Sequence, residues 1–248
     1  SLSLATVGCN FRCLHCQNYQ ISQWPHERTG IPGTELSPQD VVRHAIESGS
    51  ASISYTYTEP TIYFEYAFDT AVEARKAGIK NVFVTNGYTT TAALEAIAPY
   101  LDAANVDLKG FSDQAYRDVT GASLDGVLDC LRDYRRLGIW LEVTTLVIPG
   151  HNDSEDELRQ IATFISEELG RDVPWHISAF YPTYKMLDRP PTPVATLSLA
   201  RDLGRQAGLE YVYMGNVDDS DGGNTVYPGC GKTVIRRKRL LFLEAALV

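Results

Sequence analysis

Three cysteines near the start of the chain have the type and spacing to do chemistry. Cys9 and Cys13 are four residues apart, and Cys13 and Cys16 are three apart, in one short segment. Thiolates are soft ligands that bind zinc ions and iron–sulfur clusters. A short loop with three of them can hold one face of a [4Fe–4S] cubane and leave one iron without a protein ligand. That iron could then chelate a small molecule, which would turn an electron carrier into a catalytic centre.

Zinc is the alternative ligand for the same thiols. A structural site could combine the three cysteines with His15 or with a distant cysteine. His15 and Cys16 are adjacent, which is awkward for two ligands of one ion, and no second closely spaced pair is present. The two other cysteines have separate interpretations: Cys130 lies among apolar residues and predicts a core position, and Cys230 predicts a free thiol.

Further polar residues come where strands are expected to end. Glu59, in a Thr-Glu-Pro segment, could attract an ammonium group or could simply stabilise a helix N-terminus. Asp107 and Lys109 alternate, which predicts one shared face at a strand end, and Lys109 could meet a carboxylate. The full set of candidates outside the cysteine loop is Tyr57, Thr58, Glu59, Thr85, Asn86, Asp107, Lys109 and His176.

The elements that must position these residues alternate along the chain. Apolar or β-branched runs predict strands at 2–7, 51–57, 81–85, 103–108, 140–148, 175–179 and 210–214. Capped periodic segments predict helices at 38–49, 62–77, 91–98, 124–137, 154–169 and 194–206. Repeated strand–helix units imply parallel strands with right-handed crossovers, and the apolar runs predict cover on both faces. We therefore expect an α/β fold, a partial (β/α)6-type TIM-like barrel, with its chemistry at the carboxyl ends of the strands.

Composition limits the partners. The net charge of −9 argues against nucleic acid, and the one basic run, residues 236–239, predicts a solvated segment. No apolar run is long enough for a membrane span, and the first residues do not resemble a signal peptide, so a cytoplasmic protein without a membrane partner is expected. We expect a core domain over residues 1–217 and an irregular, Asp- and Gly-rich C-terminal extension over 218–248.

The cysteine spacing C-x3-C-x2-C, with His15 before the last cysteine, resembles the signature of the radical S-adenosylmethionine (SAM) superfamily. Segments 3–11, 55–61, 107–110 and 175–182 together are similar to its AmmeMemoRadiSam-type branch, which is pyruvate formate-lyase-activating-enzyme-like. The resemblance runs from Leu2 to about Arg236. It implies a [4Fe–4S] cluster on Cys9, Cys13 and Cys16, and reductive cleavage of SAM to a 5′-deoxyadenosyl radical that abstracts hydrogen. A zinc-stabilised binding protein on a barrel fold, without radical chemistry, is the competing hypothesis.

The resemblance also implies roles for the other candidates. The segment around Glu59 would meet the amino group of SAM, although Tyr57 and Thr58 stand where the family has two glycines. Thr85 and Asn86 would lie near the methionine moiety, Asp107 and Lys109 would orient it, and His176 would contact the ribose. The implied partners are a low-potential electron donor and a substrate that is a protein, a peptide or a small molecule; one version of the function makes a glycyl radical on a partner. Tyr227 replaces the first cysteine of a pair found in relatives, which removes an accessory metal site from the expectation.

Overall fold

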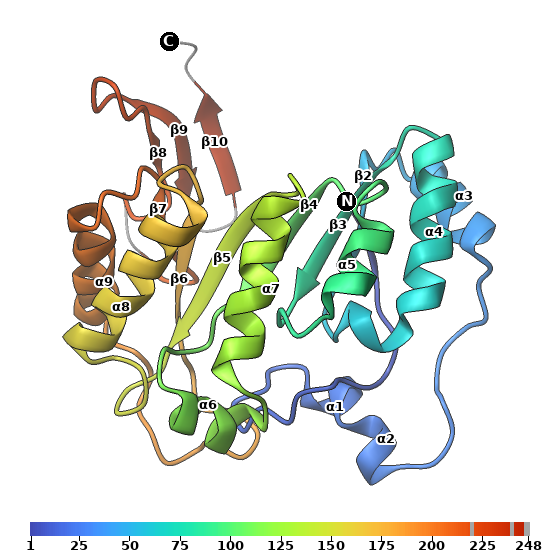
Figure 1. Ribbon diagram of the computed structural model, residues 1–248, viewed down its shortest axis with the longest axis horizontal. Helices are drawn as coiled ribbons and strands as arrows, with labels where there is room; N and C mark the ends of the chain where they lie inside the picture. The colour runs from blue at the N-terminus through green and yellow to red at the C-terminus, as the bar shows by residue number, and fades with distance from the viewer. Residues whose placement is uncertain (219–220, 239–240, 246–248) are drawn as a thin grey trace. The chain divides into compact units, whose positions relative to one another are not determined.

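The computed structural model describes residues 1–218, 221–238 and 241–245. The chain divides into two compact units: Ser1–Asp107 with Arg117–Leu141, and Leu108–Tyr116 with Glu142–Val248. Each unit alternates strands and helices, as the sequence predicts (Figure 1). None of the helices in the described part of the chain has the length and apolar character needed to span a membrane.

The first unit is built on four parallel strands that pair in chain order. The strands are β1 (Leu2–Leu4), β2 (Ser52–Tyr55), β3 (Lys80–Thr85) and β4 (Ala103–Asp107). The segments between and after them form α1 (Tyr19–Ser22), α2 (Trp24–Glu27), α3 (Pro38–Glu47), the 3-10 helix η1 (Pro60–Tyr63), α4 (Phe64–Lys76), α5 (Thr91–Ile97) and α7 (Leu124–Arg136).

Local sequence explains where these helices begin. The Ser37 hydroxyl accepts a hydrogen bond from the backbone N–H of Asp40, and the Asp40 carboxylate accepts one from Ser37 in return, which caps α3. The Thr90 hydroxyl accepts one hydrogen bond, from Ala93 N–H, and so caps α5. Each cap satisfies a backbone donor that the first helical turn leaves open.

Burial along the strands of the first unit alternates. Ile53 and Tyr55 of β2 and Phe83 of β3 are fully buried, whereas the residues between them, including Val82 and Val84, are half-buried. One strand face therefore packs into a complete core and the other keeps access to solvent. The apolar runs predict cover on both faces, and the structure shows complete burial on one face and partial burial on the other.

The second unit is built on three parallel strands, which also pair in chain order: β5 (Trp140–Val147), β6 (Trp175–Ala179) and β7 (Val212–Gly215). Helix α8 (Glu155–Phe164), capped by Ser154, continues into a π-helical turn, η2 (Ile165–Leu169), before Gly170. Helix α9 (Val194–Gln206) packs on β6 and β7, where Gly204 leaves room for the Trp175 ring. Helix α6 (Asp113–Thr120) crosses the boundary between the units in the chain.

The C-terminal extension differs from its expected irregularity. Strands β8 (Thr225–Val226), β9 (Thr233–Lys238) and β10 (Leu241–Ala245) form an antiparallel sheet in the order β10-β9-β8. Arg237 of the basic run is not simply solvated: its guanidinium lies 5.6 Å from the Tyr213 ring centroid and donates to the Thr225 hydroxyl at 2.7 Å. Arg239 lies outside the described residues. The predicted boundary at residue 217 stays a prediction.

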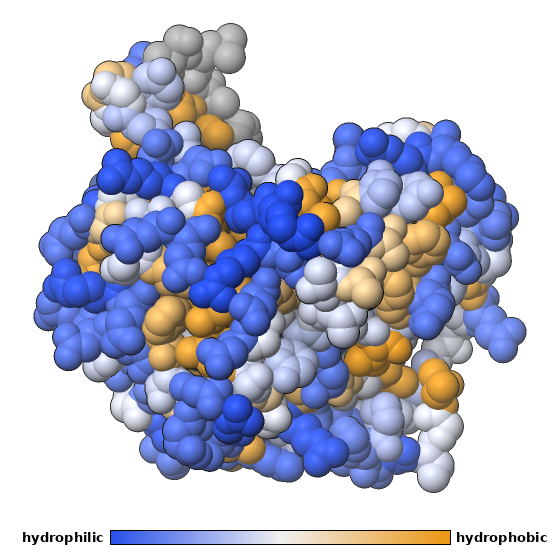
Figure 2. All heavy atoms as spheres, in the orientation of Figure 1, coloured by the Kyte–Doolittle hydropathy of each residue, from blue (hydrophilic) through white to orange (hydrophobic). Residues whose placement is uncertain are grey.

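The helices bury one stripe each. In α7, Val127, Leu131 and Tyr134 are completely buried, while the opposite side carries charged residues. Figure 2 shows the result on one face of the molecule, where hydrophilic side chains cover most of the surface and apolar ones form smaller patches. This pattern is that of amphipathic helices packed on strands.

Candidate functional site

The cysteine loop lies between β1 and α1 and is held by backbone hydrogen bonds. Arg12 N–H donates to the Thr120 carbonyl at 2.8 Å, and Leu14 N–H donates to the Val119 carbonyl at 3.0 Å. At the entrance to the loop, Gly8 N–H donates to the Ile21 carbonyl at 2.9 Å. A loop tied at both ends and in the middle presents its side chains in a defined arrangement before any ligand binds.

The three thiols of this loop have different surroundings. Cys13 is buried, and Cys9 and Cys16 are half-buried. Cys9 Sγ accepts a hydrogen bond from Phe11 N–H at 3.4 Å, and Cys16 Sγ lies 3.2 Å from the Ser22 hydroxyl. The five cysteines form no disulfide. Soft thiolate donors with amide and hydroxyl donors beside them fit the ligand chemistry of an iron–sulfur cluster.

The zinc interpretation makes a stricter geometric demand. A zinc ion needs its thiolate ligands at about 2.3 Å from a single point, whereas each thiolate of a cubane binds a different iron. Within the described residues, no three His, Cys, Asp or Glu side chains lie close enough to hold one metal ion. Convergence on one point is a requirement of the zinc hypothesis and not of the cluster hypothesis.

Glu59 lies beside the loop and is completely enclosed. Its side chain is 1% exposed. Its oxygens accept hydrogen bonds from the Thr85 hydroxyl at 2.8 Å, from Asn86 N–H at 2.8 Å and from Thr61 N–H at 3.1 Å. Burial raises the pKa of the Glu59 carboxyl, and these donors act in the opposite direction.

These contacts bear on one of the two compatible roles that the sequence suggests for the Glu59 side chain. Glu59 is the N-cap of η1, because its carboxylate accepts from Thr61 N–H. The same carboxylate ties the end of β3 to the end of β2. The side chain thus acts as a helix N-terminal acid, and the contact of Glu59 and its segment with the amino group of SAM stays a prediction.

Tyr57 and Thr58, which stand where the resembled motif has two glycines, are both held by hydrogen bonds. Tyr57 has a φ of +65°, in the left-handed region that non-glycine residues rarely adopt, and its ring is 55% exposed. Its carbonyl accepts a hydrogen bond from Asn18 Nδ2 at 2.8 Å. The Thr58 hydroxyl donates to the Thr6 carbonyl at 2.9 Å. Sequence reasoning did not select Asn18, although it follows Cys16 by two residues.

The turn after β3 comes directly against the cysteine loop. Asn86 Nδ2 lies 2.7 Å from Asn10 Oδ1 and 3.7 Å from Cys9 Sγ. Gly87 follows with a φ of +71°, and a Cβ on this residue would lie 2.6 Å from the Val106 side chain. The first unit therefore brings together the cysteine loop and the predicted residues Tyr57, Thr58, Glu59, Thr85 and Asn86.

The other predicted residues are divided between the units. Asp107, the last residue of β4, is half-buried and belongs to the first unit. Lys109 belongs to the second, where its carbonyl accepts a hydrogen bond from Asn152 Nδ2 at 3.0 Å. Asn152 is completely buried and also binds the Leu146 carbonyl and Ile148 N–H, so it fixes the turn that carries Lys109. Lys109 lies two residues beyond the end of β4, but burial still alternates there, with Leu108 buried between the half-buried Asp107 and Lys109, so their shared face stays a prediction.

His176 lies near the beginning of β6 rather than at its end. Its Nε2 is 2.6 Å from Glu142 Oε2, and its ring stacks on Tyr213 with centroids 5.2 Å apart. Both partners belong to the second unit. The predicted contact between His176 and the SAM ribose stays a prediction, and the pairing with Glu142 is one that the sequence did not reveal.

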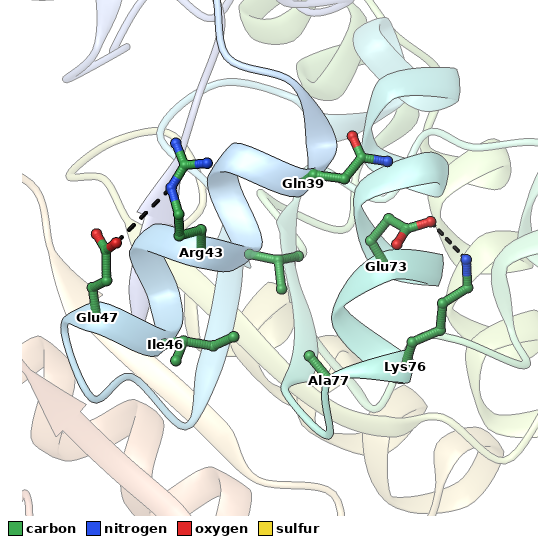
Figure 3. Close-up of a pocket in the computed structure, with 8 residues that line it drawn as sticks. Gln39, Arg43, Ile46, Glu47, Glu73, Lys76 and Ala77 are labelled. Carbon is green, nitrogen blue, oxygen red and sulfur yellow. Dashed lines mark hydrogen bonds and ion pairs between the residues drawn. The ribbon is translucent and has the colours of Figure 1, made fainter.

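A surface groove between α3 and α4 contains none of these residues. Figure 3 shows the residues that line it, including Arg43 and Ile46 on α3 and Glu73 and Lys76 on α4. The charged side chains pair within their own helices: Arg43 lies 3.9 Å from Glu47, and Lys76 lies 2.7 Å from Glu73. The groove is therefore separate from the site around the cysteine loop.

Comparison with protein-family models and curated proteins gives a consistent result. Residues 3–164 match the model described as the radical SAM superfamily. An uncharacterized protein of Methanocaldococcus jannaschii is 49% identical over 236 residues, which are 95% of this chain and 69% of that protein. The isethionate sulfite-lyase activating enzyme of Oleidesulfovibrio alaskensis is 28% identical over 64% of this chain. The pyruvate formate-lyase-activating enzyme of Clostridium pasteurianum is 23% identical over 64% of this chain.

Solved structures support the fold. Streptococcus suis SuiB, bound to S-adenosylmethionine, is similar with a TM-score of 0.68 and 16% identity over 87% of this chain. A domain of pyruvate-formate lyase-activating enzyme from Bacteroides vulgatus gives a TM-score of 0.57 and 15% identity over 66% of this chain. These likenesses confirm the predicted α/β, partial TIM-like barrel fold class. The chain spans 52% of the isethionate enzyme and 50% of the SuiB chain, and 66% of the clostridial enzyme.

Proposed function

Because this chain belongs to the radical SAM superfamily, we propose that it cleaves SAM reductively at a [4Fe–4S] cluster held by Cys9, Cys13 and Cys16. The observation that carries this proposal is the placement of three thiols on one tied loop, against the turn that contains Asn86. When bound, such a cluster would supply the electron that cleaves the sulfonium to a 5′-deoxyadenosyl radical. The chain's own residues hold, orient and shield the reactants.

Shielding comes from aromatic side chains around the loop. Phe11 is 1% exposed and packs edge-on against Tyr88, with ring centroids 5.5 Å apart. Ile62 lies against Gly8 at the loop entrance. Of these side chains only Phe11 is buried, and because it lies beside Cys9 it would reduce the access of water and oxidants to that thiolate, while the half-buried Cys9 and Cys16 would leave an approach for the cofactor.

Orientation of SAM is assigned to the residues at the strand ends. The turn at Tyr57 and Thr58 offers backbone carbonyls for the amino group of SAM, as its resemblance to the family's motif implies. The Lys109 ammonium would attract the SAM carboxylate, and Asp107 would act on the methionine moiety with it. Thr85 would support the same region through its bond to Glu59.

The reaction that follows is proposed from the named relatives. Two are activating enzymes, and a third, from Methanocaldococcus jannaschii, is named a putative glycyl-radical enzyme activating enzyme at 26% identity. We assign this chain to the same kind of reaction, abstraction of a hydrogen atom from a glycine of a partner protein. A low-potential electron donor would reduce the cluster. A peptide or a small molecule as substrate would be the alternative outcome, since a GTP 3′,8-cyclase is also related at 25% identity.

The experiment is an anaerobic incubation of the reconstituted chain with SAM and dithionite, assayed for 5′-deoxyadenosine. We expect product from the wild type and from Cys230→Ala, whose thiol is exposed and outside the loop, and none from Cys13→Ala. Equal product from Cys13→Ala would refute the ligand assignment. A colourless wild-type protein with one zinc ion and no product would refute the proposed function and favour the zinc-stabilised alternative.

A further inference from the structure

The side chain of Asn86 makes a direct contact with one of the cluster thiols. Its amide nitrogen lies 3.7 Å from Cys9 Sγ and 2.7 Å from Asn10 Oδ1. A carboxamide has two N–H donors, so both contacts can exist together. Residues 9 and 86 are far apart in the chain, and only the fold brings this donor to the sulfur.

The orientation of the amide is fixed by its other neighbours. Asn86 Oδ1 accepts a hydrogen bond from Tyr88 N–H at 3.1 Å, which places the nitrogen on the side of Cys9. If the amide were flipped, its oxygen would face the acceptor Asn10 Oδ1 and its nitrogen would face the donor Tyr88 N–H, and both hydrogen bonds would be lost. The backbone of Asn86 is held in turn by the Glu59 carboxylate at 2.8 Å. Asn86 is 6% exposed, so water does not compete strongly for its donors.

We propose that Asn86 is a positioning and tuning residue, which donates a hydrogen bond to the Cys9 thiolate and thereby makes the cluster easier to reduce. This inference rests on the proposed function, because it needs a cluster on Cys9. Reduction adds negative charge that spreads onto the ligand sulfurs, and an N–H dipole aimed at a sulfur stabilises the reduced form more than the oxidised form. Hydrogen bonds to ligand sulfurs are a known determinant of cluster potential.

This role differs from the contact with SAM that the sequence suggests for Asn86. The polar atoms of its side chain are engaged by Asn10, Cys9 and Tyr88 in the chain itself. Asn86 therefore acts on the chemistry through Cys9. The electron would reach a cluster whose potential is set partly by a residue 77 positions away in sequence.

The test is a redox titration of the anaerobically reconstituted full chain without SAM. The low-temperature EPR signal of the reduced cluster measures how much cluster is reduced at each potential. Asn86→Leu removes the amide, and Asn86→Asp keeps its shape but puts a carboxylate beside Cys9. Asn81→Leu is the matched control, because Asn81 is a completely buried amide of the same unit. Its side chain donates to the Ala71 and Tyr100 carbonyls and accepts from the Tyr55 hydroxyl.

We expect Asn86→Leu to lower the ratio of reduced to oxidised cluster about tenfold at a fixed potential, a shift of about 59 mV for one electron. Asn86→Asp should lower it further, because added negative charge opposes reduction, and Asn81→Leu should match the wild type. If Asn86→Leu does not take up a cluster, the cluster potential of the isosteric variant Asn86→Asp decides whether the inference holds.

A wild-type potential in Asn86→Asp, or an equal shift in Asn81→Leu, would overturn the inference while leaving the proposed function intact. A wild-type protein that binds no cluster would overturn both.

Discussion

The amide nitrogen of Asn18 donates a hydrogen bond to the carbonyl oxygen of Tyr57 at 2.8 Å. This bond joins the segment just after Cys16 to the turn after β2, where Tyr57 has a φ of +65°. A side chain in the left-handed region costs about 1–2 kcal/mol, which the surrounding contacts must offset. The cysteine loop and the turn are thus coupled through a strained residue.

Replacing Tyr57 by glycine should relieve this strain. The ring is 55% exposed, so little packing is lost, and we expect Tyr57→Gly to raise the free energy of unfolding by up to about 1 kcal/mol. Urea denaturation of the chain without cofactors measures this change. A loss of more than about 1 kcal/mol would instead mean that the ring contributes packing that outweighs the strain.

Gly87 should tolerate alanine poorly. Its φ is +71°, and a Cβ would lie 2.6 Å from Val106 Cγ1 and 3.2 Å from Val127 Cγ1. We expect Gly87→Ala to destabilise the chain by about 3 kcal/mol, from backbone strain and overpacking together. Gly78→Ala is the matched control, because Gly78 has a φ of +73° with nothing within 4 Å of the added Cβ, and it should cost only about 1 kcal/mol. Equal losses in urea denaturation would contradict the steric argument.

Glu59 should make stability depend on pH. Burial raises the pKa of its carboxyl from the ordinary value of 4.5, so the unfolded chain loses this proton first as the pH rises. The contribution of Glu59 to stability is therefore complete below the ordinary value and declines as the pH rises towards the raised value. Glu59→Gln cannot titrate.

The measurement for Glu59 is the free energy of unfolding of wild type and Glu59→Gln at about pH 5 and about pH 8. We expect the difference, wild type minus variant, to be smaller at the higher pH. A difference that grows with pH would mean that the donors from Thr85 and Asn86 outweigh desolvation.

Lys109 should contribute to SAM affinity and not to cluster assembly. Lys109→Met keeps most of the side-chain length and removes the charge, and we expect SAM to bind about tenfold more weakly, as the loss of one charge-assisted contact implies. Iron content should stay at the wild-type value. Equilibrium dialysis with labelled SAM measures the affinity, and Lys185→Met serves as a control outside the predicted site. An unchanged affinity would remove Lys109 from the site.

Much of the core fold could be predicted from local signals. The bounds of β6 and α9 are those predicted, because apolar runs, flanking prolines and a final glycine mark them clearly. Helices α1, α2 and α6 and strands β8 to β10 were missed; α1 and α2 lie in a polar segment that predicts a loop. The strand signal of Thr233-Val234-Ile235 stood beside a run of Asp and Gly residues, whose composition suggested irregular structure.

Only part of the candidate site could be predicted from the sequence. The three cysteines could be grouped because a short segment of chain keeps them together. The contacts of Asn86 with Cys9 and of His176 with Glu142 join residues that are distant in the chain, and no local pattern encodes them. The burial of Glu59 likewise depends on tertiary packing, since a Glu-Pro pair can stand at the start of an exposed helix as well as of a buried one.

The most direct test of the account is the metal content of the chain after anaerobic reconstitution with iron and sulfide. We predict a brown protein with about four irons and a broad absorbance near ~400 nm in the wild type and in Cys130→Ser, and less than half of that iron in Cys9→Ser, Cys13→Ser or Cys16→Ser. Full iron content in all three loop variants, or no iron in the wild type, would contradict the account.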